Sequence, residues 1–130
     1  MSAASDYLEN ALLDHTLRNT AYAQPAVLYI GLFTASTGLE ENTPSAEIGG
    51  GSYVRKTATF AVASSGSSAT SATITFDTAT ANWGTVTHVA VLDAATAGNV
   101  LFWGAVTTSK TIETGDTFQI SSGNLTISLA

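Results

Sequence analysis

The stretch WGTVTHVAVLDAATAGNVLFWG, residues 83–104, decides the fold class of this chain. It holds two runs rich in Val, Leu and aromatic residues, one over residues 86–92 and another that starts at Val100 and continues to residue 107. The turn residues Ala97-Gly98-Asn99 separate the two runs. Short apolar runs bounded by turn residues are typical of β-strands, so this stretch predicts two strands separated by a turn.

Strand patterns also precede this stretch. Residues 26–34 are apolar on both faces and predict a strand that is buried on both sides. Residues 53–61 alternate between apolar and polar side chains, which predicts a half-solvated strand. The predicted apolar face of that strand carries Val54, Ala58 and Phe60.

Further strands are expected after the stretch, at residues 117–120 and 125–129, again between turn sequences. Short strands that are closely spaced by turns indicate a β-sandwich or barrel. We therefore predict a mainly β fold, an antiparallel and jelly-roll-like β-sandwich over residues 26–130, in a single domain that spans residues 1–130.

The only helical pattern precedes the strands, within an N-terminal helix and arm over residues 1–20. Ser5 can cap a helix over residues 6–17, and Asp6 and Glu9 suit the positive end of its dipole. A helix this short is marginal in water, so it must dock either on its own domain or on a neighbouring chain. Its candidate interface residues are Leu8, Leu12, Leu13 and Leu17.

Residues 35–52 show little periodicity and contain the run Gly49-Gly50-Gly51. This composition predicts a long, mobile and exposed loop. A phosphate-binding loop is not expected, because no Gly-Lys-Ser/Thr sequence follows and no helix pattern opens there.

The composition excludes several classes of function. Of the 130 residues only 11% are charged, against roughly 25% in typical soluble domains, so a surface covered by partners is expected. The net charge of −6 argues against nucleic acid and acidic membranes as partners, and the absence of Cys excludes thiolate chemistry. No apolar stretch approaches the ~18 residues of a membrane span and no signal peptide is apparent, so we expect synthesis in a cytoplasm.

The sequence predicts a non-enzymatic protein with no catalytic, cofactor-binding or metal-binding residues. His15 and His88 are far apart and have no acidic residue at ligand spacing, and the many hydroxyl groups form no nucleophile motif. The alternative is a hydrolase with paired carboxylates. Its candidate carboxylates are Asp77, Asp93, Glu113 and Asp116.

Three aromatic residues, Tyr53, Trp83 and Trp103, are further candidates for an interface, since Trp and Tyr are favoured there. Phe102 and Trp103 are adjacent within one predicted strand and must point to opposite faces of the sheet. The alternative is that both layers of a sandwich, or a covering loop, bury these rings.

Over nearly its whole length the sequence resembles a family of small tailed-phage virion proteins commonly labelled tail-fibre proteins. The resemblance is carried by five segments in a specific order and spacing: SDYLENALLDHTLRNTAY, LYIGLFTA, GGGSYVRKTATF, the stretch over residues 83–104, and TTSKTIETGDTFQISSGNLTISL. It implies a structural component of a phage virion. It implies no catalytic residues.

A compact body of 130 residues is too short for a free-standing fibre, so the main expectation is an oligomeric head decoration or cement protein on the particle exterior. The alternative is a tail, baseplate or tail-fibre attachment protein. A carbohydrate-binding β-sandwich module, with exposed aromatic rings stacked on sugars, is the second alternative. The expected partners are other copies of the chain, for example in a trimer, and the major capsid or tail proteins.

Overall fold

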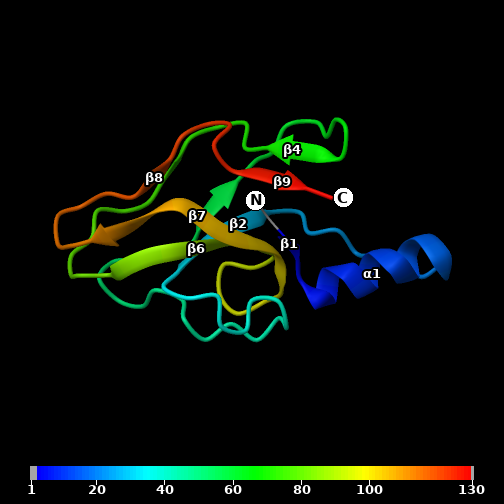
Figure 1. Ribbon diagram of the computed structural model, residues 1–130, viewed down its shortest axis with the longest axis horizontal. Helices are drawn as coiled ribbons and strands as arrows, with labels where there is room; N and C mark the ends of the chain where they lie inside the picture. The colour runs from blue at the N-terminus through cyan, green and yellow to red at the C-terminus, as the bar shows by residue number, and fades with distance from the viewer. Residues whose placement is uncertain (1–2, 130) are drawn as a thin grey trace.

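A computed structural model describes residues 3–129 of the chain. A five-stranded antiparallel sheet forms its centre, in the order β1-β7-β6-β2-β3 (Figure 1). The longest ladder joins the two strands of the 83–104 stretch, as the pattern of that stretch predicts. In chain order the strands of this sheet are β1 (Ala3–Ala4), β2 (Leu28–Phe33), β3 (Lys56–Ala58), β6 (Gly84–Leu92) and β7 (Val100–Ile112).

Four short strands form two further antiparallel pairs, β5 with β8 and β4 with β9. Figure 1 shows β4 beside β9. Their bounds are β4 (Ser67–Ala69), β5 (Ile74–Thr75), β8 (Gln119–Ile120) and β9 (Thr126–Ser128). Side chains from these strands and their flanks pack on one face of the central sheet. The predicted mainly β, antiparallel fold with sandwich-like layers is confirmed. That residues 1–130 make one domain stays a prediction.

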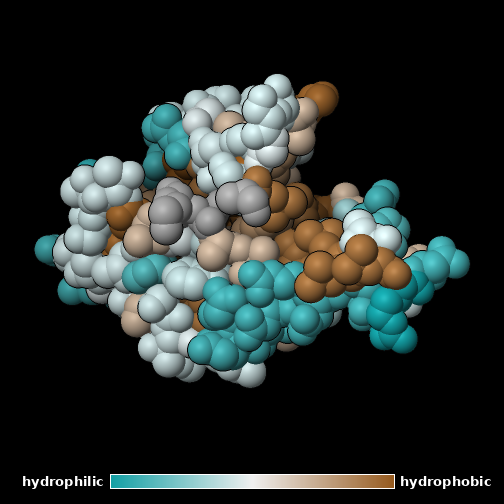
Figure 2. Space-filling view, turned by 45° about the vertical axis from the view of Figure 1, so that its right-hand side comes forward, coloured by the Kyte–Doolittle hydropathy of each residue, from teal (hydrophilic) through white to brown (hydrophobic). Residues whose placement is uncertain are grey.

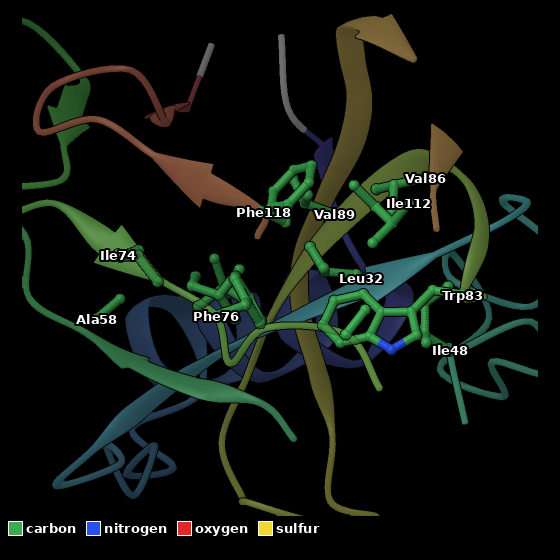
Figure 3. Close-up of a cluster of buried hydrophobic side chains, with 13 residues drawn as sticks. Leu32, Ile48, Ala58, Ile74, Phe76, Trp83, Val86, Val89, Ile112 and Phe118 are labelled. Carbon is green, nitrogen blue, oxygen red and sulfur yellow. The ribbon is translucent and has the colours of Figure 1, made fainter. Parts of the chain in front are cut away.

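The main core lies between these two layers (Figure 3). Ile30 and Leu32 of β2 and Val89 of β6 enter it from the central sheet, while Phe76 and Phe118 close it from the other side. Phe33 of β2 points the other way into a smaller buried cluster. Strand β2 is therefore buried on both faces, as its apolar sequence predicts.

The prediction of an exposed loop over residues 35–52 is wrong at two positions. Leu39 is fully buried in the smaller cluster, and Ile48 is buried in the main core. The second half of the loop also runs beside β2, where the Ile48 amide donates to the Leu32 carbonyl at 3.0 Å. The physical reasons differ. Leu39 covers the apolar second face of the central sheet. Ile48 lies in the segment that runs beside β2, and its side chain packs in the main core on the first face.

The predicted strand over residues 53–61 is shorter in the structure, and Val54 does not lie on its buried face. Only Lys56–Ala58 pair with β2, and Val54 is 52% exposed. Positive φ angles at Gly50, Gly51 and Ser52 turn the chain just before this segment, so the strand alternation does not extend back to Val54.

The single helix within residues 3–129, α1 (Asp6–Leu17), has the predicted bounds. The Ser5 hydroxyl caps it by accepting a hydrogen bond from the Leu8 amide at 3.3 Å, as expected from the sequence. Figure 1 shows that α1 starts beside β1 and extends away from the sheet. Within residues 3–129 no helix has the length and apolar character needed to cross a membrane.

Candidate interaction surface

The start of α1 is fixed to the central sheet. The Ser5 amide donates to the Leu101 carbonyl at 2.9 Å, and the Ser5 hydroxyl donates to the Val100 carbonyl, both on β7. The Asp6 amide donates to the Glu40 carbonyl at 2.8 Å. These contacts hold the first turn, while the second half of the helix extends beyond the sheet (Figure 1).

The four leucines of α1 are therefore exposed to very different degrees. Leu8 is buried by its own chain, because it lies in the anchored first turns, and this burial removes it from the predicted interface. Leu12 is half-buried. Leu13 and Leu17 are 55% and 76% exposed. For Leu12, Leu13 and Leu17 the interface role stays a prediction.

Trp83 is a core residue, so its predicted place in an interface is wrong. Its side chain is buried in the main cluster (Figure 3), and its indole Nε1–H donates to the Gly51 carbonyl at 2.8 Å. A Cβ at position 51 would lie 2.7 Å from that nitrogen, so the third glycine of the Gly-Gly-Gly run makes room for the indole. No pattern in the sequence indicates that this run lies against a tryptophan.

Tyr53 is half-buried and also belongs to the main core. Its ring stacks on Phe76 at 6.2 Å and meets the edge of Trp83 at 5.5 Å. Its hydroxyl donates to Glu47 Oε2 at 2.7 Å and accepts from the Leu32 amide at 3.0 Å. Burial, followed by the bond to Glu47, raises the pKa of this hydroxyl above its ordinary value. The ring and the hydroxyl of Tyr53 therefore make their contacts within their own chain.

Trp103 lies on the opposite face of β7 from Phe102, as the strand period predicts. Phe102 packs on the main core and Trp103 on the smaller cluster, where Trp103 is half-buried. The Trp103 indole donates to Glu40 Oε1 at 3.0 Å, and its ring lies 6.1 Å from that of His88. This hydrogen bond fixes the ring against the chain.

A buried ion pair that the sequence did not predict joins three segments of the chain. Arg55 Nε and Nη2 each donate to the Glu47 carboxylate at 2.7 Å, a bidentate pair. Arg55 Nη1 donates to the carbonyls of Ala94 and Ala97, at 2.8 Å in both cases. The bonds to Glu47 raise the pKa of Arg55. All four of these bonds are made within the chain, so the ion pair functions as a structural clamp.

Three carboxylates, those of Asp6, Glu9 and Glu40, bring ligand atoms within 4.8 Å of one another. Partial burial, followed by the proximity of Asp6, raises the pKa of Glu40, and the Trp103 indole opposes this rise. Asp6 and Glu9 are exposed, and exposed acidic groups commonly gather without an ion. We assign no metal site to this cluster.

Three of the four carboxylates that a hydrolase would use have structural partners, namely those of Asp77, Asp93 and Asp116. Asp93 accepts from the backbone amide of Asn99 at 2.6 Å, and Asp116 accepts from the amide of Glu113 at 2.9 Å, both within turns. Asp77 accepts from Lys56 Nζ at 2.8 Å. Turn chemistry therefore accounts for Asp93 and Asp116.

Two hollows open between the layers. The larger, about 680 Å³, lies between β7 and the segment over residues 117–127, and polar and apolar side chains line it. The smaller, about 270 Å³ and called the apolar groove below, lies between the ends of the central sheet and the β4–β9 pair. Its lining includes Leu28, Phe60, Ala63, Phe102, Ile127 and Leu129.

Exposed apolar side chains gather on the side of the molecule where α1 extends. Figure 2 shows a broad hydrophobic area there, bordered by hydrophilic residues. The large hydrophobic side chains that the structure leaves exposed include Leu13, Leu17, Val27 and Leu129. Contiguous exposed apolar patches are typical of surfaces that bind other molecules, which makes this area the candidate interaction surface.

The sequence matches a protein-family model over nearly its whole length. The model described as Podophage GP4 fiber I protein gp80 matches residues 3–128. No curated protein matches the chain at a significant level.

Proposed function

Because the chain belongs to the family described as Podophage GP4 fiber I protein gp80, we propose that it is a non-enzymatic structural subunit of the tail-fibre apparatus of a phage particle. The observation that carries this proposal is the extent of the match, which reaches from β1 to the end of β9. Membership of a fibre family supports a place in the virion.

Of the two locations considered from the sequence, the family favours the tail. Head decoration was the main expectation, based on the small size and low charge of the chain, but the family description names a fibre protein. The tail, baseplate or fibre-attachment alternative therefore becomes the proposed function. The carbohydrate-binding alternative loses support, because Trp83 is buried and the indole of Trp103 is hydrogen bonded within the chain.

A compact subunit can serve a fibre only by assembling, and we propose that it does so with further copies of itself. Leu13 and Leu17 each keep more than half of their surface in water. Fully burying a leucine contributes about 1.5–3 kcal/mol, so completing the burial of both supplies a few kcal/mol at most. Association itself costs about 4–15 kcal/mol, so the contact must bury more than these two side chains.

The location is tested by counting and labelling the protein in purified particles. Quantitative mass spectrometry is expected to give a few dozen copies or fewer per particle, and gold-labelled antibody is expected to mark the tail. Hundreds of copies distributed over the head would overturn the tail location in favour of decoration. Absence of the protein from purified particles would overturn the structural role altogether.

A further inference from the structure

The apolar groove has the size and chemistry of a receptor for aliphatic side chains. A dry cavity of ~150 Å³ accommodates benzene, so the 270 Å³ of the groove has room for two leucine side chains. None of the described residues that line it carries a charge, and Ser67 and Ser68 supply small hydroxyl groups at its border. An inserted charged or strongly polar group would lose hydration there without gaining a partner.

The end of α1 has the complementary shape and chemistry. Leu13 and Leu17 are four residues apart, so they lie on one face of the helix, one turn above the other. Ser5 is bonded to the carbonyl of Leu101, and Leu101 itself lines the groove. Leu17 lies twelve residues further along the helix, about 18 Å from that anchor, and its exposure shows that it does not enter the groove of its own chain.

We propose that the apolar groove receives Leu13 and Leu17 from the α1 helix of a second copy of this chain. This proposal rests on the self-assembly proposed above and specifies its contact. Every copy carries one such helix end and one such groove, so the contact repeats from copy to copy and closes into a ring or a reciprocal pair. Each copy then takes part in two contacts, which brings the buried area closer to that of a stable interface.

The charges favour a second copy as the occupant. Two chains of net charge −6 repel each other unless they meet where charge is low, and the groove is such a place. The acidic residues Asp6 and Glu9 lie in the first turn of α1, far from its free end. At the free end Asp14 lies 3.7 Å from Arg18, which leaves this part of the helix close to neutral.

The test measures the mass of the full-length chain by sedimentation over a range of concentrations. Leu17→Asp on the helix, and Leu129→Asp and Ala63→Glu on the groove, are each expected to weaken association at least tenfold. Val62→Asp is the matched control. It adds the same charge, and Val62 is 94% exposed and does not line the groove. It is expected to leave association unchanged. Far-UV circular dichroism and the urea midpoint of each variant establish that it is folded.

A charge pair then tests whether the two surfaces touch. The double variant Leu17→Asp with Leu129→Lys places opposite charges on the helix of one copy and the groove of the next, and should regain at least tenfold in association over Leu17→Asp alone. If only the helix variant weakens association and the groove variants behave like Val62→Asp, the helix docks elsewhere and the groove assignment is wrong. A wild-type chain that stays monomeric at every concentration overturns self-assembly, whereas the tail location is judged separately by labelling particles.

Discussion

Replacing Arg55 by methionine is expected to destabilise the fold by about 3 kcal/mol. Breaking a buried ion pair by removing one partner costs about 3–5 kcal/mol, because the remaining charge stays buried without compensation. The Arg55 side chain is 6% exposed, and its loss removes two bonds to Glu47 and two to backbone carbonyls. The Glu47 side chain is 24% exposed and keeps its hydrogen bond from the Tyr53 hydroxyl. Water can therefore reach the remaining carboxylate, and the loss of stability falls at the lower end of that range.

The next residue provides a matched control. Lys56 Nζ lies 2.8 Å from Asp77, a distance close to the 2.7 Å of the Arg55 pair, but the Asp77 side chain is 53% exposed. Exposed ion pairs contribute about 0–1 kcal/mol, so Lys56→Met is expected to cost less than about 1 kcal/mol. The double variant Arg55→Met with Glu47→Met should cost less than the two single variants added together, because the pair is removed as a unit.

Urea unfolding followed by far-UV circular dichroism measures these differences, with the free energy of unfolding taken from the midpoint and slope of each transition. An unchanged slope is required for the comparison to report stability alone. If Arg55→Met lowers the free energy of unfolding no more than Lys56→Met does, then burial of the Arg55–Glu47 pair does not determine its contribution to stability, and the prediction is wrong.

Three further predictions concern single positions, each measured by urea or thermal unfolding. Ser5→Ala should cost up to about 2 kcal/mol, because the hydroxyl caps α1 and also binds β7; a cost near zero would mean that water replaces it. Gly38→Ala should lower the free energy of unfolding clearly more than Gly50→Ala. The two φ angles are nearly equal, +77° and +76°, but an added Cβ would collide with the Thr43 carbonyl at position 38 and would meet nothing within 4 Å at position 50. Glu40→Gln should stabilise the fold at pH 7, because the pKa of Glu40 is raised in the folded state and its charge therefore lowers stability above that pKa. The gain in stability should vanish at low pH, where Glu40 is also neutral. A gain that persists at low pH would have another cause.

Features with local causes could be predicted from the sequence. The bounds of α1 and its Ser5 cap follow from capping chemistry within one turn, and β2, β6 and β7 follow from short apolar runs between turn residues. The family match also confirms the resemblance to tail-fibre proteins, which was carried by the order of several segments along the chain.

Features that depend on contacts distant in sequence could not be predicted. Leu39 and Ile48 lie in a segment without periodicity. Leu39 is buried because it covers the second face of the sheet, and Ile48 is buried because the segment runs beside β2 and places it in the main core. The partner of Arg55 lies eight residues away across a turn, and no pattern of residue types marks that pairing. Local propensity describes neither case, because tertiary packing decides both.

The candidate interface illustrates the same limit, and one strand takes part in both the fold and the proposed assembly. Composition treats Trp83, Leu8 and Leu17 alike as apolar, yet Trp83 fills the core beside Gly51, Leu8 packs near the anchor of α1, and Leu17 extends into solvent. Strand β7 supplies that anchor through Leu101 and also lines the apolar groove with the same residue. A substitution at Leu101 would therefore disturb the fold and the proposed contact together. Substitutions at the exposed positions of the two surfaces, Leu17 on the helix and Ala63 and Leu129 in the groove, can separate the proposed assembly from stability.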